Sequence, residues 1–439
     1  MERQCLNRLI WAVLLMVSFA CNQQKKTSIN DADVVHQNQD QLTQIIIYDV
    51  FTPPVASRIY VYSSLASYEA IRHSKPDAPS IAAKLHEFAP MPEPEKGKTY
   101  NYTLAATKAF FTVVHKVVFS VDSLKSYEKS TYAKFKASMD DATYNRSVAF
   151  GDSIGNIVVA RAKTDGYPQS RGKQKYLGSN EPGKWRPTPP DYLDGVEWCW
   201  NTMKPMVMDS AAQFKPVRPP VYSSDSTSAF YKYAKEVYTV NKTLTDSLKM
   251  IAKFWDDNPF VIEHSGHMMF GNKKITPGGH WMGIAAIAAK ESKADAVKVA
   301  MTYSLTSIAL YDAFISCWDE KYRSSLVRPV TVINELIDRN YVPYLQTPPF
   351  PEYTSGHSTI SASAATVLTA LYGDNFAFRD TSDLRYIGME RNFKSFQQAA
   401  GEASISRLYG GIHYHFGVDV GSEQGKKVGA FIVQRTLKK

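Results

Sequence analysis

Apolar residues recur at intervals of three and four through most of this 439-residue sequence, which is the period of one face of an α-helix. Runs in which β-branched residues alternate with polar ones, as a sheet requires, are few and short. No internal repeat of fixed period is evident. The sequence therefore predicts an all-α protein of helical bundles joined by long loops. The expected helices cover approximately residues 42–72, 102–119, 123–138, 145–164, 228–255, 283–318, 329–337, 358–372, 382–401 and 421–436.

Two long irregular segments separate these helices: residues 167–220, rich in Pro, Gly and Trp, and residues 258–281, rich in Gly and His. Loops of this length are usually functional or wrap the surface of a larger domain. We therefore expect one large helical domain over residues 42–439, with a core at about residues 283–436 that carries the motifs below. Residues 300–318 are apolar enough to raise the question of a membrane span, but Asp312 and several hydroxyl groups favour a buried core helix.

The N-terminus has the pattern of an export signal. Arg3 and Arg8 precede an apolar run that ends at Ala20, and this run is shorter than the roughly 20 residues of a spanning helix. A small residue directly before Cys21 resembles the signal of a bacterial lipoprotein, in which Cys21 would carry the lipid. We expect a signal peptide at residues 1–20, a flexible tether at residues 21–41 and an exported protein held at the periplasmic or outer surface by its lipid.

Charge and cysteine content restrict the possible partners. The formal net charge of +9, which becomes +8 without residues 1–20, suits an anionic substrate or reflects a generally basic surface. No Lys/Arg block or nucleic-acid-binding signature is present, so no nucleic-acid partner is expected. Cys199 and Cys317 remain in the body of the chain without the spacing of a metal site, and the sequence does not determine whether they pair.

Three separated pieces in the last third of the chain carry groups that bind anions. The first, KYRSSLVRP, holds Lys321 and Arg328 nearly two helical turns apart, so both can face one side. The second, TSGH, puts Ser355, Gly356 and His357 at the start of an expected helix. A helix N-terminus with a glycine approach donates backbone N–H groups to an anion, although the same residues also make an ordinary helix cap.

The third piece, SRLYGGIH, carries Arg407 and His413 across a helix end expected at Gly410–Gly411. Each piece alone is a weak signal, since Lys and Arg are mostly solvated surface residues. Together they supply an ammonium, two guanidiniums, a hydroxyl beside a glycine N–H, and two imidazoles. A planar guanidinium pairs two oxygens at once, so this set predicts a site for a tetrahedral oxyanion such as phosphate or vanadate.

The three pieces resemble the pattern of the type 2 phosphatidic acid phosphatase and vanadium haloperoxidase superfamily. That pattern is Lys, six residues, Arg-Pro; then Pro-Ser-Gly-His; then Ser-Arg, five residues, His. This chain departs from it at Thr354, which replaces the proline. The motif region covers about a quarter of the chain. The segments FWDDNP, TPGGHW and CWDEKY, at residues 254–259, 276–281 and 317–322, are similar to those of secreted bacterial vanadium haloperoxidases, including iodoperoxidases.

The resemblance implies a helical haloperoxidase-like fold and a role for each motif residue. The family often has Asp four residues after the last His, to orient its ring; Gly417 stands there, so either the loop is longer and Asp419 supports the ring, as we expect, or another group orients it. The implied roles are neutralisation of vanadate by Lys321, Arg328 and Arg407, hydrogen bonds to it from Ser355 and the Gly356 N–H, vanadium ligation by His413, acid–base chemistry by His357 and polarisation of peroxide by Lys321.

The expected activity is a vanadium-dependent haloperoxidase that oxidises halide, with iodide favoured, to hypohalous acid with hydrogen peroxide. Trp318, Asp319 and Phe350 flank the motifs and are expected to shape the halide approach, or else simply to pack. Vanadate would act as a Lewis acid without changing oxidation state.

Two other activities remain open. An acid phosphatase would use the same cage for phosphate, with a phospho-histidine at His413. The long N-terminal helical half and the lack of a set of membrane helices favour the peroxidase. A non-catalytic, glycan-binding surface lipoprotein would leave the Lys/Arg/His set unexplained.

Overall fold

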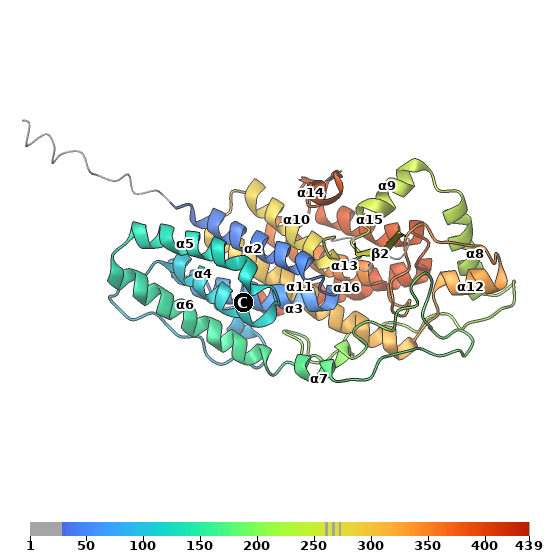
Figure 1. Cartoon of the computed structure of the whole chain (residues 1–439), viewed down its shortest axis with the longest axis horizontal. Coiled ribbons are helices and arrows are strands. Elements are labelled where there is room, and N and C mark those ends of the chain that lie inside the picture. Colours follow the sequence, from blue (N-terminus) through green and yellow to red (C-terminus); the bar gives the residue numbers. More distant parts are fainter. Residues whose placement is uncertain (1–28, 260–261, 266–267, 272–273, 439) are drawn as a thin grey trace, which may run out of the picture.

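The computed structural model describes residues 29–438, apart from residues 260–261, 266–267 and 272–273 (Figure 1). The predicted signal peptide, Cys21 and the first part of the predicted tether lie outside the described residues. Within them the chain forms fifteen α-helices and two antiparallel sheets of two strands each, so the all-α prediction is confirmed. The helices form an elongated body, in which the N-terminal helices lie at one end and α8 and α12 lie at the other (Figure 1).

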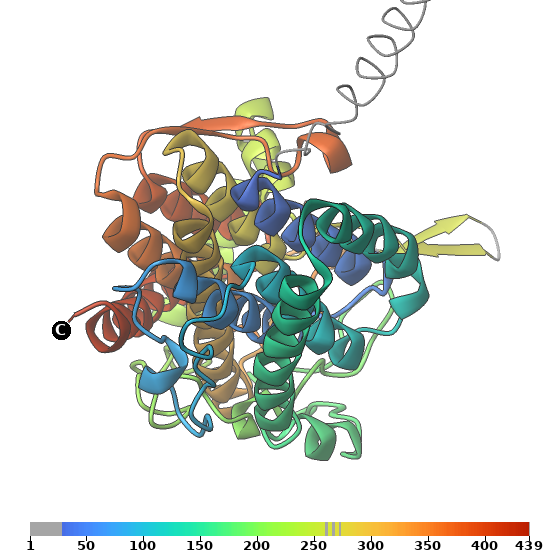
Figure 2. The same cartoon turned by 90° about the vertical axis from the view of Figure 1, so that its left-hand side faces the viewer.

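The first bundle surrounds helix α3, whose residues are all buried although the helix carries several polar side chains. Thr52 caps it and two prolines open it, which suits the first turn because proline has no N–H to leave unpaired. The bundle is seen end-on in Figure 2. Its helices are α2 (Asp31–Tyr48), α3 (Pro53–Ile71), α4 (Tyr102–Val117), α5 (Lys125–Ser138) and α6 (Asp141–Ala162).

The predicted tether over residues 21–41 is too long. Helix α2 already begins at Asp31, after a cap in which the Asn30 side chain accepts from two backbone N–H groups. Its Val34, Val35 and Leu42 are buried. The polar composition of this segment suggested a linker, but its few apolar residues lie on one face and pack against the bundle, so the domain starts about ten residues earlier than expected.

Helix α11 (Ala296–Ser324) connects the two halves of the molecule. It packs against α3 of the first bundle and against α10, α13 and α16 of the second. Asp312, near its middle, accepts hydrogen bonds from the backbone N–H groups of Met206, Val207 and Met208, which satisfy a carboxylate that is fully buried. The prediction of a buried core helix is confirmed. Among the described residues, no helix combines the length and apolarity needed to span a bilayer.

The second bundle carries the motifs at its helix ends. Gly421, Gly425 and Gly429 lie on the face of α16 that packs on α13, and a Cβ atom at Gly425 or Gly429 would overlap the backbone carbonyl of Thr359 or Ser363. The glycines therefore bring the helix that follows His413 into close contact with the helix that starts at Ser355. The bundle comprises α10 (Pro277–Glu291), α11, α13 (Gly356–Tyr372), α15 (Phe396–Tyr409) and α16 (His415–Thr436).

The long segment after α7 (Tyr167–Arg171) wraps over the motif region, as its length suggested. The Trp185 N–H donates to the Ser325 carbonyl, and the Val196 N–H donates to the Pro349 carbonyl, so the segment fixes the loops after α11 and α12. The predicted helix over residues 228–255 is divided where Thr245 caps a second helix. The outer helices are α8 (Ala229–Lys242), α9 (Asp246–Phe254) and α12 (Pro329–Leu336).

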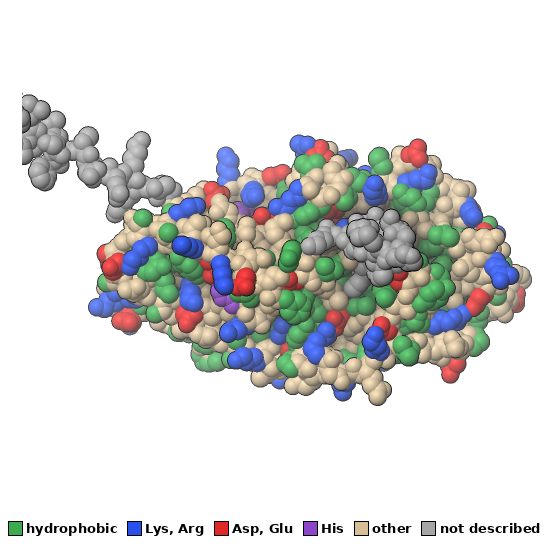
Figure 3. Space-filling model, in the orientation of Figure 1, with side chains coloured by type: hydrophobic (Ala, Val, Ile, Leu, Met, Phe, Trp, Pro, Cys, Tyr) green, Lys and Arg blue, Asp and Glu red, His purple; other side chains and the backbone are tan. Residues whose placement is uncertain are grey.

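The single helix predicted over residues 382–401 is only partly confirmed, because residues 396–401 lie in α15 but a strand interrupts the segment before them. Strand β3 (Phe378–Asp380) pairs with β4 (Arg391–Phe393), and only the short helix α14 (Leu384–Ile387) lies between them. Gly388 ends that helix with φ of 69°, in the left-handed region, which reverses the chain. The other sheet pairs β1 (Ile262–Ser265) with β2 (Met268–Gly271). On the face shown in Figure 3, basic and acidic side chains are interspersed.

Because His36 is buried, we predict that the folded protein loses stability at acid pH. His36 of α2 lies against Tyr303 of α11, 2.6 Å from its hydroxyl, and burial lowers the pKa of His36 to about 4. The unfolded chain therefore binds a proton that the folded chain does not, and stability present above the ordinary histidine pKa is lost as the pH falls toward 4. We expect about 2 kcal/mol of this loss between about pH 7 and about pH 5.

Thermal unfolding at the two pH values measures this effect. The control is His36→Asn, whose amide replaces Nδ1 toward Tyr303 without the ionisable ring, and we expect it to unfold with a smaller pH dependence. An unchanged dependence in that variant would show that other groups cause the acid sensitivity.

Candidate active site

A small cavity lies where the motif-bearing helix ends of the second bundle meet. Its wall includes Trp318, Phe350, His357, Arg407 and His413, together with the backbone of Gly356. These residues come from α11, α13, α15 and two loops, so only the fold brings them together. The cavity wall is mostly apolar; its polar side chains include His357 of the second sequence piece and Arg407 and His413 of the third, while the cations of the first piece lie behind the wall.

Lys321 lies directly behind the aromatic wall of the cavity. Its ammonium nitrogen donates to the carbonyls of Pro351 and Glu352, both at 3.0 Å, and lies 5.0 Å from the ring centre of Phe350. The side chain is fully buried, and burial lowers the pKa of Lys321 to about 7. Because the hydrogen-bond partners of this ammonium are neutral carbonyls, they do not cancel its charge, and the group still attracts an anion.

Arg328 precedes α12, and its guanidinium carbon also lies 5.0 Å from the ring centre of Phe350. It donates from Nε to the Phe350 carbonyl at 2.8 Å and from Nη1 to the Ile412 carbonyl at 2.9 Å. Nη1 also lies 3.1 Å from Nε2 of His413, while Nη2 has no partner in the described residues. Burial lowers the pKa of Arg328 to about 10.

Arg407 and His357 meet at the carbonyl of Trp255. Arg407 donates to this carbonyl from Nη1 at 2.6 Å, and the imidazole of His357 also makes a backbone hydrogen bond with Trp255. Arg407 Nε and His357 Nε2 are both buried and have no partner among the described residues. Burial and the neighbouring guanidinium of Arg407 hold the pKa of His357 well below its usual value, so its ring is neutral near pH 7.

Ser355 caps α13, as the sequence predicted, and its hydroxyl accepts from the Ser358 N–H at 3.3 Å. Gly356 is the first residue of that helix, so its N–H is one of the donors that a helix leaves unpaired at its start. Thr354, at the position of the family's proline, donates its hydroxyl proton to Gln424 of α16 at 2.7 Å. This bond gives the threonine a structural use, because it ties the start of α13 to α16.

The orientation of His413 follows from its two partners. An arginine only donates hydrogen bonds, so Nε2 of His413 must be the acceptor toward Arg328, and Nδ1 carries the proton. Nδ1 donates to Oε1 of Glu352 at 2.7 Å, and the same oxygen accepts from the Tyr414 N–H at 3.1 Å. His413 is therefore a neutral ring with the Nε2 lone pair on the side of the cationic groups.

The carboxylate on His413 is Glu352, and the expectation for Asp419 is wrong. Asp419 is exposed and lies 3.8 Å from His415, on the outer side of α16. A Cβ atom at Gly417 would overlap the carboxylate of Glu352, so that carboxylate fills the space of an aspartate at position 417. The sequence signal was available: Glu352 is the only acidic residue in the proline-rich segment over residues 343–354 that leads into TSGH.

The three predicted halide-pocket residues separate in the structure. Trp318 and Phe350 both line the cavity, with ring centres 5.0 Å apart. Asp319 does not line it; its carboxylate accepts from Asn201 at 3.3 Å and lies 3.9 Å from Arg323. Successive helix residues point about 100° apart, so a residue adjacent to Trp318 on α11 faces a different surface. Cys199 and Cys317 are both buried and both free.

The donor set fits a tetrahedral oxyanion. Lys321, Arg328 and Arg407 are buried cations whose hydrogen-bond partners in the described chain are carbonyl groups and the His413 ring. Burying charge without a counter-ion is costly, and here the unpartnered Nη2 and Nε donors remain near one cavity. An anion with several oxygens would supply the missing acceptors, and His413 would offer it one neutral nitrogen.

A variant of Glu352 tests the support of His413. We expect Glu352→Ala to weaken vanadate binding by about 10–100-fold, the range typical for groups that hold a metal-ligating histidine. Adding Gly417→Asp should recover part of the loss, because the new carboxylate enters the vacated space. Equilibrium dialysis with vanadate measures both, with Asp419→Asn as the control. Full affinity in Glu352→Ala would contradict the assignment.

Comparisons with known proteins agree with this geometry. A family model described as the VCPO second helical-bundle domain matches residues 301–342 and 336–439. The crystal structure described as the first bacterial vanadium-dependent iodoperoxidase superimposes with a TM-score of 0.86 at 46% identity, covering 92% of this chain and 96% of that one. No curated protein matches the sequence.

Two further solved structures share the fold at low identity. The holo form of a bacterial vanadium-dependent chloroperoxidase has a TM-score of 0.66 and 17% identity, covering 89% of this chain and 93% of that one. An apo form has a TM-score of 0.68 and 17% identity, covering 88% and 94%. At this identity they show the fold alone. The 46% identity over almost the whole of both chains, together with the site geometry, establishes that the chain belongs to the vanadium-dependent haloperoxidases.

Proposed function

We propose that the protein binds vanadate in this cavity and uses it to oxidise iodide with hydrogen peroxide. The observation that carries the proposal is the group of three buried cations, Lys321, Arg328 and Arg407, whose electrostatic effects all reach His413. Each of the three lowers the pKa of His413 below its usual range, with burial as the largest cause. A neutral imidazole beside three buried cations suits a ligand to an anionic metal oxide better than it suits a structural ion pair.

Each residue then has a distinct task. When bound, vanadate supplies a Lewis acid that activates hydrogen peroxide without changing its own oxidation state. His413 Nε2 would be its protein ligand, with Glu352 holding the ring. Lys321, Arg328 and Arg407 would neutralise the anion, and Ser355 and the Gly356 N–H would hydrogen-bond its oxygens. His357 Nε2 is available to take up and release protons.

The apolar wall supports iodide as the halide. Phe314, Trp318 and Phe350 contribute aromatic rings to the cavity. A large, polarisable halide loses less hydration energy than a small one when it enters such a site, since the solvation cost falls with ionic radius. The relative at 46% identity is described as an iodoperoxidase, which supports the same choice. The overall reaction consumes one peroxide, one halide and one proton, and yields hypohalous acid and water.

Steady-state assays with vanadate-loaded protein test this function. We expect oxidation of iodide by hydrogen peroxide with kcat/KM at least about tenfold above that for bromide, equivalent to about 1.4 kcal/mol of transition-state preference. The same preparation is assayed with p-nitrophenyl phosphate in the absence of vanadate. Phosphatase activity without any halide oxidation after loading would replace this proposal with the phospho-histidine phosphatase. Faster bromide than iodide oxidation would overturn the halide assignment alone.

A further inference from the structure

Two consecutive carboxylates lie beside the cavity, close to one of its cationic groups. Asp256 and Asp257 follow α9, and Asp257 forms part of the cavity wall beside Arg407. Both carboxylates are buried and near enough to Arg407 to raise its pKa against the lowering effect of burial. A free carboxylate here would pair with Arg407 and repel a bound oxyanion. The structure must therefore neutralise these two charges by other means.

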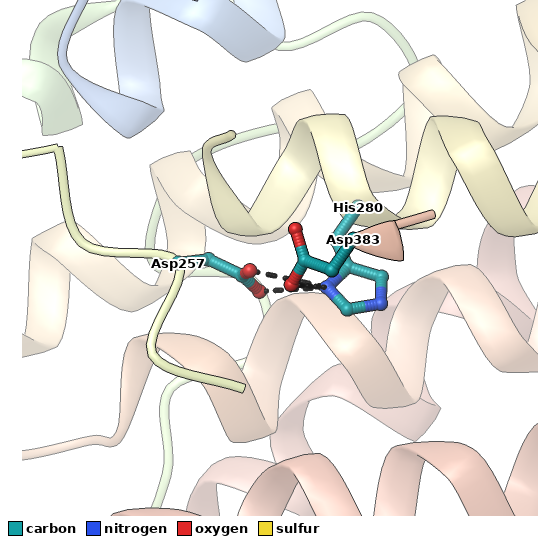
Figure 4. Close-up of side chains that lie close together, drawn as sticks. All are labelled: Asp257, His280 and Asp383. Carbon is teal, nitrogen blue, oxygen red and sulfur yellow. Dashed lines mark hydrogen bonds and ion pairs between the residues drawn. The ribbon is translucent and has the colours of Figure 1, made fainter. Parts of the chain in front are cut away.

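A cationic side chain lies against each carboxylate: Lys274 against Asp256, and His280, which two further carboxylates share, against Asp257. Lys274 donates to Oδ2 of Asp256 at 2.8 Å, which leaves the other oxygen of this carboxylate unpartnered among the described residues. The ring nitrogen Nδ1 of His280 lies 3.1 Å from both oxygens of Asp257. Figure 4 shows the Asp257 carboxylate facing the His280 ring, which comes from α10.

His280 is a cation on the basis of its contacts. Its second nitrogen, Nε2, lies 3.0 Å from Asp380, and Asp383 lies 3.6 Å from Nδ1. Carboxylates accept hydrogen bonds, so an imidazole between two of them needs a proton on each nitrogen. The ring also stacks on Trp255 with centres 4.5 Å apart and an angle of 17°, and an indole face attracts a cation. The three carboxylates raise the pKa of His280 well above its usual value despite complete burial.

Arg407 shows the consequence. Its Nη1 donates to the Trp255 carbonyl and its Nε has no partner among the described residues, although Asp256 and Asp257 lie near enough for their charges to act on it. Trp255 is fixed by the same histidine through ring stacking. We propose that His280 and Lys274 are positioning residues that retain Asp257 and Asp256, so that the Arg407 guanidinium stays available to the oxyanion. This inference rests on the proposed binding of vanadate in the cavity.

A pair of variants, in which a second substitution should rescue the first, tests the inference on the full-length protein. His280→Gln leaves Asp257 without its cation, and we expect vanadate affinity to fall at least about tenfold as the carboxylate pairs with Arg407, which corresponds to about 1.4 kcal/mol. Removing the freed charge in His280→Gln/Asp257→Asn should restore affinity to within about threefold of wild type. A role in packing alone predicts the reverse, because the second substitution would add damage. A double variant as weak as the single one would therefore overturn the proposal.

The second ion pair repeats the test at a less buried place. Lys274→Gln is expected to weaken vanadate binding and Lys274→Gln/Asp256→Asn to recover it, so the proposal stays testable if His280→Gln does not fold. Asp165→Asn is the control: it breaks the buried Arg58–Asp165 pair of the first bundle. It should lower the unfolding temperature while leaving vanadate affinity unchanged. Equal loss of affinity in the control would assign the effect to general destabilisation.

Two further outcomes are distinguishable. Affinity is measured by equilibrium dialysis with vanadate, and with inorganic phosphate as a competitor. If wild-type protein binds neither anion, the proposed function fails and this inference fails with it; if wild type binds and every variant equals it, only this inference fails. Asp257, His280 and Asp383 also lie close enough to share a cation. A stoichiometric divalent metal in the purified protein would overturn the assignment of His280 as the charge that holds Asp257.

Discussion

Replacing His413 by alanine is expected to abolish stoichiometric vanadate binding and, with it, halide oxidation. Nε2 of His413 is the neutral nitrogen that faces the cationic groups, because Nδ1 carries the proton given to Glu352. The loss should exceed the roughly 10–100-fold reduction typical of groups that only support a ligand. Equilibrium dialysis gives the vanadate affinity, and the oxidation of iodide gives the activity.

The neighbouring histidine provides a matched control for this variant. His415 lies two residues on, half-exposed, with Nδ1 at 2.9 Å from Glu236. Its replacement by alanine should leave both vanadate affinity and iodide oxidation unchanged. Retained one-to-one binding of vanadate by His413→Ala would remove this residue as the ligand. Activity without measurable binding would instead point to an oxidation that does not use the cavity.

Replacing His357 by alanine should separate binding from turnover. The ring lines the cavity, its Nε2 has no partner among the described residues, and its pKa is held well below its usual value, so the ring itself adds no charge to the cavity near pH 7. We expect vanadate affinity within a few-fold of wild type and kcat lower by about 10²–10⁴, the range for loss of a general acid–base group. A bound anion stabilises the protonated form of His357 and so raises the pKa of its ring. The activity that depends on this proton should therefore decline as the pH rises above the pKa of His357 in the anion-bound protein.

Measuring kcat for iodide across the pH range, beside vanadate affinity at each pH, tests the role of His357. The variant should have a flatter profile than wild type, with the difference largest where wild type is most active. Turnover equal to wild type at the optimum would rule out His357 as the acid–base group. A parallel loss of affinity and kcat would indicate that the ring holds vanadate instead.

The predictions from the sequence agree best with the structure where neighbouring residues alone determine the secondary structure, through helical periodicity and capping. Helix α11 was recognisable because its apolar residues recur over 29 positions, and α13 because Ser355 supplies a cap immediately before a clean helical pattern. The helix predicted over residues 382–401 was continuous, and the structure interrupts it for the complementary reason. Residues 391–393 have no strong local preference, and their pairing as β4 with β3, between residues about 11 to 15 positions apart, decides their conformation.

The site shows the same division. Residue types and spacing predicted an anion site at Lys321, Arg328, His357, Arg407 and His413, and the structure brings these residues together at or directly behind one cavity wall. The resemblance and the place beside the motif also suggested Asp419 and Asp319, which face away from the cavity. Their assignment failed because proximity in sequence does not fix the direction of a side chain on a helix or a loop.

The sequence by itself determined the helical class and the chemical inventory of the site, because both depend on residue type and on short-range periodicity. Only the tertiary structure decided that Glu352 fills the space beside Gly417 to hold His413, and that His280 retains Asp257 at the edge of the cavity. These contacts join residues 61 and 23 positions apart. Their energies depend on burial and on mutual distance, and the packing of the bundles sets both.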